Sequence, residues 1–253
     1  MTLHVDRLGA GADLVLLHGW ALHGGAWTAV AKRLASRFRV HVVDLPGHGH
    51  SRDVPLHDLE SLAARVAEVV PAGSAACGWS LGGLVAMKLA AIAALGIRAL
   101  GLVATTPSFV TREGWTAGLA PDRLAGFSRE LGRDRDEAVR SFLRLNAHGA
   151  PGARHCARRL DALVVERPPA ADAALAAGLD VLARTDLRAE ASRLAQPAVV
   201  IHGLGDGLVP AVAGRFLAAT LPRARFVGLE DAAHALPLTH AGAIAHALET
   251  LDG

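Results

Sequence analysis

Short apolar segments bounded by glycine, proline and aspartate alternate with alanine-rich segments of helical periodicity along most of this chain. The apolar segments lie at 14–19, 39–47, 74–80, 99–107, 197–206 and 224–234, and the helical ones at 26–36, 58–70, 81–95 and 210–220. Strands that alternate with helices form a mostly parallel sheet covered by helices on both faces. The pattern therefore predicts an α/β fold, in which ligands bind beyond the carboxyl ends of the strands.

The alternation stops between residues 107 and 186. Apolar residues keep a helical spacing there, strand-like runs are missing, and glycine or proline interrupts the pattern at 149–152 and 167–170. A chain of 253 residues, 51% of them hydrophobic, can bury the core of one elaborated fold. We therefore expect a core formed by 1–106 and 187–253, with 107–186 inserted as a helical lid.

Charge and hydropathy exclude several classes of protein. The 26 basic and 24 acidic residues give a formal net charge of +2, without the excess that typifies nucleic-acid binding. Lys88 and Arg98 interrupt the most apolar region, which leaves it too short to cross a bilayer. The first residues lack the pattern of a secretory signal, and two cysteines without metal-type spacing favour a reducing compartment. We expect a cytoplasmic monomer that binds neither nucleic acid nor membrane.

A G-x-S-x-G motif spans residues 78–82, at the end of one apolar run and the start of a helical segment. Gly78 and Gly82 leave room for a sharp turn that would expose the hydroxyl of Ser80. A serine hydroxyl is a poor nucleophile at neutral pH and needs a base that a third group orients. The motif therefore predicts a catalytic serine with two partners elsewhere in the chain.

Asp206 and His234 stand at the ends of the last two apolar runs, so the predicted sheet places both at the same edge as Ser80. The order Ser, Asp, His is the one used by enzymes with this elbow. We predict that Ser80 is the nucleophile, His234 the base and Asp206 the group that orients it. The backbone N–H groups of Leu81 and Trp20 are the predicted oxyanion donors, and the chemistry requires no cofactor and no metal.

The phrases "LLHGW", "DLPGHGHS", "GWSLGG", "DGLVP" and "AAHALP" resemble those of the α/β-hydrolase superfamily and cover the chain outside the lid. The phrases "PDRLAGF", "SFLRLN" and "TDLRAE" of the lid segment are similar to BioH-type pimeloyl-[acyl-carrier protein] methyl ester esterases of biotin synthesis. This resemblance implies an α/β-hydrolase fold and a serine carboxylester hydrolase. It also implies acyl carrier protein as the partner that holds the esterified acyl chain, besides small-molecule esters.

The resemblance also implies roles for particular residues. The implied substrate-binding residues are Trp20, Leu81, Phe142, Leu143, Leu145, Asn146 and His234. The implied carrier-docking residues are Arg140, Arg144, Arg154 and Arg158. Ser141 and Glu137 depart from the pattern, because basic residues are expected there, so docking could be weaker or shifted toward Arg140 and Arg144.

Several alternatives remain open at this stage. The chain could be a general short-chain carboxylesterase, another Ser-His-Asp enzyme such as the menaquinone-pathway lyase, or a hydrolase-fold protein that binds a ligand without turnover. Trp20 could be an ordinary core aromatic, and the lid arginines could form a solvated helix face. His48 and His50 near Asp44 raise the possibility of a metal site, but their loop is common in the superfamily. The oligomeric state and acyl-chain length are not determined by the sequence.

Overall fold

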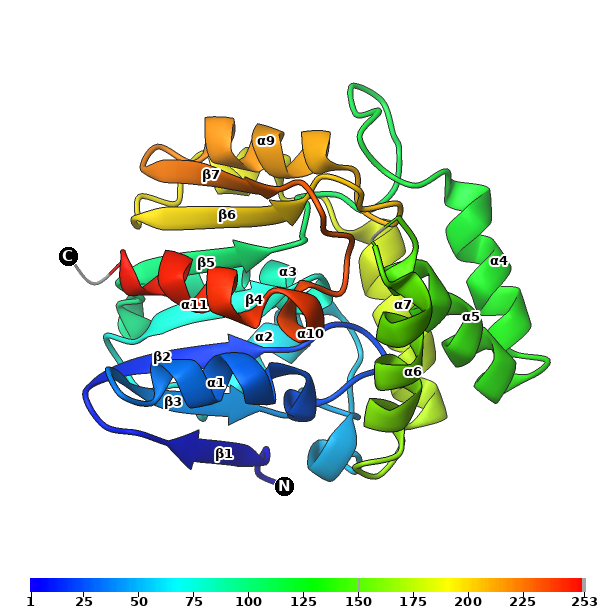
Figure 1. Cartoon of the computed structure of the whole chain (residues 1–253), viewed down its shortest axis with the longest axis horizontal. Coiled ribbons are helices and arrows are strands. Elements are labelled where there is room, and N and C mark those ends of the chain that lie inside the picture. The colour runs from blue at the N-terminus through cyan, green and yellow to red at the C-terminus, as the bar shows by residue number, and fades with distance from the viewer. Residues whose placement is uncertain (150, 252–253) are drawn as a thin grey trace.

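The computed structural model describes residues 1–149 and 151–251, and one seven-stranded sheet runs through them (Figure 1). The strands are β1 (Val5–Leu8), β2 (Ala12–Leu17), β3 (Phe38–Val43), β4 (Ala75–Trp79), β5 (Ala99–Val103), β6 (Ala198–Gly203) and β7 (Ala224–Leu229). Their order in the sheet is β1-β3-β2-β4-β5-β6-β7, and all neighbours are parallel except β1 and β3. The predicted mostly parallel sheet is confirmed.

Strand β1 was not among the predicted apolar runs. It pairs antiparallel with β3 at the edge of the sheet, where Val5 lies opposite Val43. Its four residues are half-buried or exposed, whereas every residue of β4, β5 and β6 is buried. An edge strand this short has no continuous apolar signal, so the hydrophobic pattern alone does not detect it.

Helices cover both faces of the sheet (Figure 1). Helices α1 (Thr28–Leu34) and α11 (Ala241–Glu249) pack against each other on one face, and α2 (Leu59–Ala67) and α3 (Leu81–Ala91) on the other. Helix α9 (Ala211–Thr220) packs on β6 and β7. Helix α3 is buried on nearly all sides, which explains why its sequence is apolar without a polar face.

Four longer helices lie between β5 and β6, in the segment 107–186 that we call the lid segment. They are α4 (Pro121–Leu131), α5 (Arg135–Ala147), α6 (Ala153–Val164) and α7 (Asp172–Arg184), and the short α8 (Arg188–Ala191) leads back to β6. These helices stand beyond the carboxyl ends of the parallel strands (Figure 1). The expected interruptions at 149–152 and 167–170 fall between helices. Residue 150 of the predicted lid and residues 252–253 of the predicted second core range lie outside the described residues.

Short helical turns complete the connections at the same end of the sheet. They are η1 (Gly24–Trp27), η2 (Gly49–Ser51) and α10 (Leu236–Thr239), whereas η3 (Ala93–Leu95) follows α3 and leads into the start of β5, at the opposite end. Within the described ranges, none of the helices has both the length and the apolar character needed to cross a membrane.

Candidate active site

Ser80 occupies a strained turn between β4 and α3. Its backbone has φ 56° and ψ −118°, a conformation that costs free energy for a residue with a side chain. The glycines around it allow this turn, because a Cβ on Gly78 would lie 2.0 Å from the carbonyl oxygen of Gly82. The hydroxyl of Thr105 donates to the carbonyl oxygen of Ser80 across 2.8 Å. The G-x-S-x-G sequence thus forms a sharp elbow at the carboxyl edge of the sheet.

Asp206 and His234 meet at the same edge. Nδ1 of His234 donates to Oδ2 of Asp206 across 2.8 Å, and both side chains are buried. The other carboxylate oxygen of Asp206 accepts the backbone N–H groups of Leu208 and Val209 at 2.9 and 2.8 Å. Because a carboxylate only accepts, Nδ1 carries the proton and the neutral imidazole keeps Nε2 as an acceptor. That Nε2 is buried and has no hydrogen-bond partner among the described side chains and backbone.

The charge of Asp206 is stabilised by two histidines. Burial raises the pKa of Asp206, but His234 and His202 outweigh burial and hold this pKa well below its usual range. Nε2 of His202 lies 3.5 Å from Oδ2 of Asp206 and donates to the carbonyl oxygen of Val209. The carboxylate therefore stays ionised at neutral pH. Sequence reasoning missed His202, although its place four residues before Asp206, in a buried strand, was a usable signal.

Contacts of Trp79 and Gly19 bring Ser80 close to the other site residues. The indole N–H of Trp79 donates to the carbonyl oxygen of His234 across 2.9 Å. A Cβ on Gly19 would lie 3.4 Å from the Cβ of Ser80, so the loop that contains Trp20 runs beside the elbow. Ser80 is 3% exposed, and its Oγ makes no hydrogen bond to any residue that the structure describes. The structure therefore gathers all three predicted triad residues at one edge.

The ring of Trp20 links this loop to the lid segment. Its indole N–H donates to the carbonyl oxygen of Leu175 in α7 across 2.9 Å, and its ring centroid lies 4.6 Å from that of Phe142 in α5. Phe127 of α4 packs 5.4 Å from Phe142, also edge to face. Gly178 of α7 leaves room for the indole, since a Cβ there would lie 2.6 Å from Cδ1 of Trp20. Sequence reasoning did not assign Phe127, Leu175 or Gly178 to the site.

The other implied substrate-binding residues of α5, Leu143, Leu145 and Asn146, lie on different faces of that helix. The carbonyl oxygen of Asn146 accepts the backbone N–H of Ala235, next to His234, at 3.1 Å, and its side chain donates to the carbonyl oxygen of Phe142. Leu143 lines a separate groove between α5 and the end of α6, and Leu145 is half-buried. Phe142 thus contacts Trp20, and Asn146 contacts the loop of His234.

A buried ion pair joins the lid segment to the loop after Trp20. Oδ1 of Asp44 accepts the N–H of Gly24 at 2.6 Å, and Oδ2 accepts the N–H of His50 at 2.8 Å and the guanidinium of Arg167 at 2.9 Å. Burial raises the pKa of Asp44, but the neighbouring His18, the backbone N–H groups and Arg167 lower it overall. Asp44 thus stays ionised and links Arg167, which follows α6, to Gly24 of η1.

The histidines beside Asp44 are neutral and take part in fixed hydrogen bonds. His18 donates from Nδ1 to the carbonyl oxygen of Gly19 at 2.8 Å and accepts the N–H of Leu45 at Nε2. His48 donates from Nδ1 to the carbonyl oxygen of Pro46. Burial lowers the pKa of His18 to about 3 and that of His48 to about 4. These side chains therefore hold the loops of the site in place as uncharged groups.

The four predicted docking arginines differ in their partners. Arg140 and Arg144 of α5 both form ion pairs with Glu137 of the same helix. Arg154 and Arg158 of α6 are exposed and have no hydrogen bond or ion pair within the described part of the chain. The unpaired positive charge of this set is therefore on α6 and not on α5. The presence of Glu137 in the sequence did not by itself show which arginines it neutralises.

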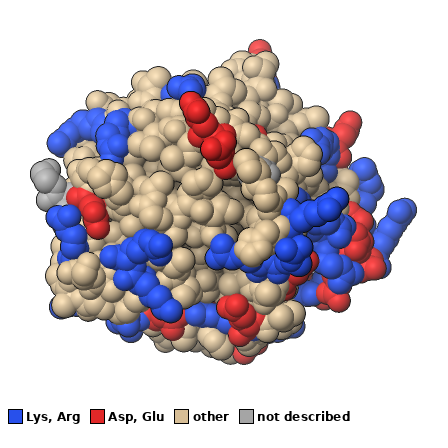
Figure 2. Space-filling view, in the orientation of Figure 1, with Lys and Arg blue, Asp and Glu red and all other residues tan. Residues whose placement is uncertain are grey.

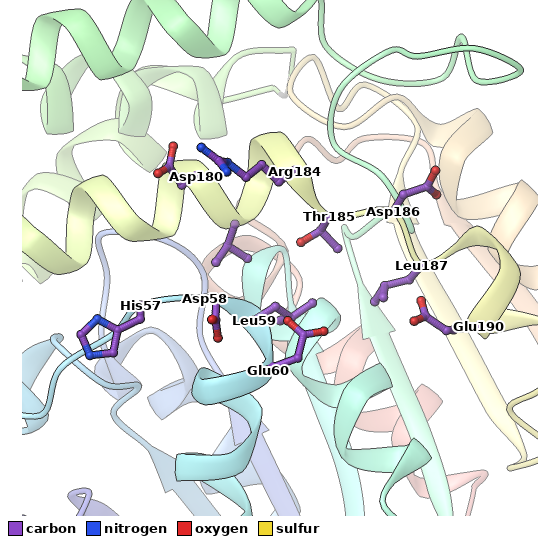
Figure 3. Close-up of a pocket in the computed structure, with 11 residues that line it drawn as sticks. His57, Asp58, Leu59, Glu60, Asp180, Arg184, Thr185, Asp186, Leu187 and Glu190 are labelled. Atoms are coloured by element: carbon purple, nitrogen blue, oxygen red, sulfur yellow. The ribbon is translucent and has the colours of Figure 1, made fainter.

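A cleft of about 440 Å³ between α2, α7 and α8 contains none of the predicted triad residues (Figure 3). Four of its five lining carboxylates have structural partners: Asp58 caps α2, Glu60 and Glu190 pair with Lys88, and Asp186 pairs with Arg188. This cleft lies where the lid segment returns to the core, and we assign it no chemistry.

Comparison with known proteins adds a family to this geometry. A model of the alpha/beta hydrolase family matches residues 14–247. A relative from Nitrosomonas europaea, named pimeloyl-[acyl-carrier protein] methyl ester esterase, is 41% identical over 92% of this chain and 93% of its own length. Relatives with the same name from Aeromonas hydrophila and Stenotrophomonas maltophilia are 42% and 41% identical over 95% and 98% of this chain, and 95% of each relative is covered.

Solved structures agree on the fold. An esterase from Exiguobacterium antarcticum superposes with a TM-score of 0.89 at 22% identity, covering 99% of this chain and 96% of that one. A hydrolase from Pseudomonas aeruginosa PA01 gives a TM-score of 0.82 at 27% identity, covering 99% and 94%. The resemblance expected from the motifs and the predicted fold class are both confirmed. The chain belongs to the alpha/beta hydrolase family.

Proposed function

We propose that this protein is a serine carboxylester hydrolase that cleaves the methyl ester of pimeloyl-acyl carrier protein in biotin synthesis. The observation that carries the reaction class is the buried Asp206–His234 hydrogen bond beside the strained elbow of Ser80. The substrate is inferred from the relatives, which share about two fifths of their residues with this chain over nearly its whole length and carry the name of that esterase.

The first half of the reaction forms an acyl-enzyme. Oγ of Ser80 attacks the carbonyl carbon of the methyl ester while Nε2 of His234 takes the hydroxyl proton. Asp206 stabilises the imidazolium that results, and its low pKa keeps it ionised throughout. The N–H groups of Leu81 and Trp20 stabilise the oxyanion. The bond from carbon to the methoxy oxygen then breaks, and that oxygen takes the proton from His234 and leaves as methanol.

The second half clears the enzyme. Water loses a proton to Nε2 of His234 and attacks the acyl carbon, and Ser80 recovers its proton when the carbon–Oγ bond breaks. The product is the carboxylate of the pimeloyl group, still attached to its carrier. The reaction transfers no electrons and requires no cofactor.

The acyl chain lies against the aromatic side chains of Trp20 and Phe142 in this proposal. Both rings are buried and in contact with each other, so they form an apolar wall near the elbow. Arg154 and Arg158 supply positive charge for the acidic carrier. The buried free thiols of Cys77 and Cys156 agree with a cytoplasmic location, and we propose that the protein acts as a monomer.

Growth of a biotin-requiring strain that lacks its own pimeloyl ester hydrolase tests the function. The wild-type gene is expected to restore growth without biotin, and the Ser80→Ala gene is not. If wild type fails to restore growth but the purified protein hydrolyses p-nitrophenyl butyrate, the chain is a general carboxylesterase instead. If neither activity is present, it is a ligand-binding protein of this fold.

A further inference from the structure

A groove of about 430 Å³ lies on the boundary between the core and the lid segment. We call it the seam groove. Its walls come from η1 and α1, from α6 with the residues after it, and from α10. Two of these walls continue directly from the site: η1 begins four residues after Trp20, and α10 begins two residues after His234. The seam groove is therefore formed in part by the chain segments that follow Trp20 and His234.

Three cations line the seam groove, from both of its sides. Lys32 and Arg33 belong to α1, and Arg159 belongs to α6. Lys32 has no hydrogen bond or ion pair within the described residues, and Arg33 donates only to the carbonyl oxygen of Ala29 in its own helix. Lysine and arginine side chains gather over α1 and α6 on this face of the molecule (Figure 2). Glu166 is the one carboxylate among the described lining residues, so the groove has an excess of positive charge.

Arg159 crosses the boundary itself. Its guanidinium donates to the carbonyl oxygen of Leu238 in α10, which is a neutral acceptor. An anionic acceptor would form a stronger hydrogen bond with the same guanidinium. Apolar residues of α6 and α10, namely Ala162, Leu163, Pro237 and Leu238, form the rest of the two facing walls. The groove thus combines an anion-binding rim with an apolar lining.

The proposed substrate reaches the enzyme on a flexible phosphopantetheine arm, which is joined to its carrier by a phosphodiester. Since Ser80 is 3% exposed, the arm must cross the boundary between lid and core to bring the ester to the elbow. The unpaired Arg154 and Arg158 that would receive the carrier are on α6, the same helix that forms one wall of the groove, whereas Glu137 neutralises the arginines of α5. A carrier docked on α6 would therefore place its arm at the seam groove.

We propose that the seam groove binds the phosphodiester of this arm through Lys32, Arg33 and Arg159. Lys32 and Arg33 lie on the core side and Arg159 lies on the lid side, so the bound phosphate bridges α1 and α6. The rest of the arm follows the apolar walls toward Ser80. This inference rests on the proposed function, because it takes the substrate to be carrier-bound.

Binding without turnover tests the proposal. Ser80→Ala protein is titrated by calorimetry with the methyl pimeloyl thioesters of phosphopantetheine and of pantetheine, which differ only in the phosphate. We expect the phosphorylated compound to bind about tenfold more tightly or better, since hydrogen bonds between charged groups are stronger than those between neutral groups. Adding Lys32→Gln and Arg33→Gln should bring the ratio of the two Kd values toward one. Arg159→Gln, made separately, should lower the ratio as well.

Arg193 and Arg223 provide a matched control. Both are exposed, lie outside the seam groove and have no side-chain partner in the described structure, so the Arg193→Gln, Arg223→Gln protein should keep the full ratio. A ratio of the two Kd values near one in the Ser80→Ala protein that keeps Lys32, Arg33 and Arg159 would overturn the assignment. An unchanged ratio after Lys32→Gln and Arg33→Gln would overturn it as well. If Lys32→Gln and Arg33→Gln weaken binding of the intact carrier ester but keep the ratio of the two Kd values, the cations contact the surface of the carrier. The phosphate assignment is then wrong.

Failure of the proposed function gives a different result. Wild type would then release no methanol from the carrier-bound ester, whatever the ratio of the two Kd values. If methanol is released but the ratio is near one, the function stands and the seam groove is not the phosphate site.

Discussion

Nδ1 of His234 and Oδ2 of Asp206 are 2.8 Å apart in a fully buried hydrogen bond that fixes the imidazole tautomer. Because the carboxylate holds the proton on Nδ1, Nε2 is available for the proton of a nucleophile. Asp206 is itself held by the N–H groups of Leu208 and Val209, so the orientation of His234 is set by the backbone after β6. Three strand ends, β4, β6 and β7, thus supply the parts of one reaction centre.

Replacing Asp206 with asparagine should cut turnover by about 10⁴-fold while KM changes little. The amide can donate to Nδ1, which moves the imidazole proton to Nε2 and removes the base. Steady-state hydrolysis of p-nitrophenyl butyrate measures the effect. A loss of less than tenfold would mean that another group orients His234.

Gly178→Ala should lower kcat for the same ester by about tenfold, on the scale of losses caused by small misplacements near a reacting centre. The new methyl group would lie 2.6 Å from Cδ1 of Trp20, so the indole and the loop that carries the proposed oxyanion donor must move. Gly126→Ala is the matched control, because it lies in helix α4 and its Cβ would meet only a flexible arginine at 3.9 Å. That control should keep full activity and gain up to about 1 kcal/mol of stability. If the two variants had equal activity, the position of Trp20 would not affect catalysis.

These two predictions also show what sequence could and could not supply. Ser80, Asp206 and His234 were identifiable because each stands at the end of an apolar run, and the parallel order of the strands brings such positions together. The packing of Trp20 on Gly178 and Leu175 could not be identified in this way, because these residues lie more than 150 positions from Trp20. No local pattern shows which side chain a helix of the lid segment presents to the core.

The lid segment gives a second example. Its helices were recognisable from apolar spacing, but the pairing of Glu137 with both Arg140 and Arg144 depends on side-chain positions along α5. The sequence presents Arg140, Arg144, Arg154 and Arg158 as four equivalent candidates for docking. The structure distinguishes the paired α5 arginines from the unpaired Arg154 and Arg158.

Arg154→Gln with Arg158→Gln should raise KM for pimeloyl-carrier methyl ester about tenfold relative to KM for p-nitrophenyl butyrate. Exposed charges steer the encounter with an acidic partner, and added salt should mimic the variant. Arg140→Gln with Arg144→Gln should have a smaller effect, because Glu137 already neutralises those side chains. An equal effect of both pairs, or none from Arg154 and Arg158, would indicate a solvated helix face.

The buried histidines predict that acid destabilises the fold. Burial lowers the pKa of His18 to about 3 and of His48 to about 4, whereas the unfolded chain returns both pKa values to about 6.5. Below that pH the unfolded chain binds more protons than the folded one, so the free energy of unfolding should fall as the pH drops from about 6.5 toward 4. Between pH 7.5 and 5 the loss should be about 2 kcal/mol for each histidine.

Urea unfolding at both pH values measures this loss. His48→Gln removes one titrating group and should reduce the dependence on pH, while the exposed His57→Gln should leave it unchanged. The same pH dependence in His48→Gln as in wild type would show that His48 is not a source of the acid sensitivity.

Methanol release from purified pimeloyl-acyl carrier protein methyl ester tests the central claim most directly. Wild type should release one methanol for each carboxylate formed, and Ser80→Ala, with an unchanged circular dichroism spectrum, should be slower by at least about 10³-fold, as removal of a triad nucleophile implies. No methanol release by wild type, or comparable release by Ser80→Ala, would contradict the assignment of this chain as a Ser80-dependent esterase of the carrier-bound pimeloyl group.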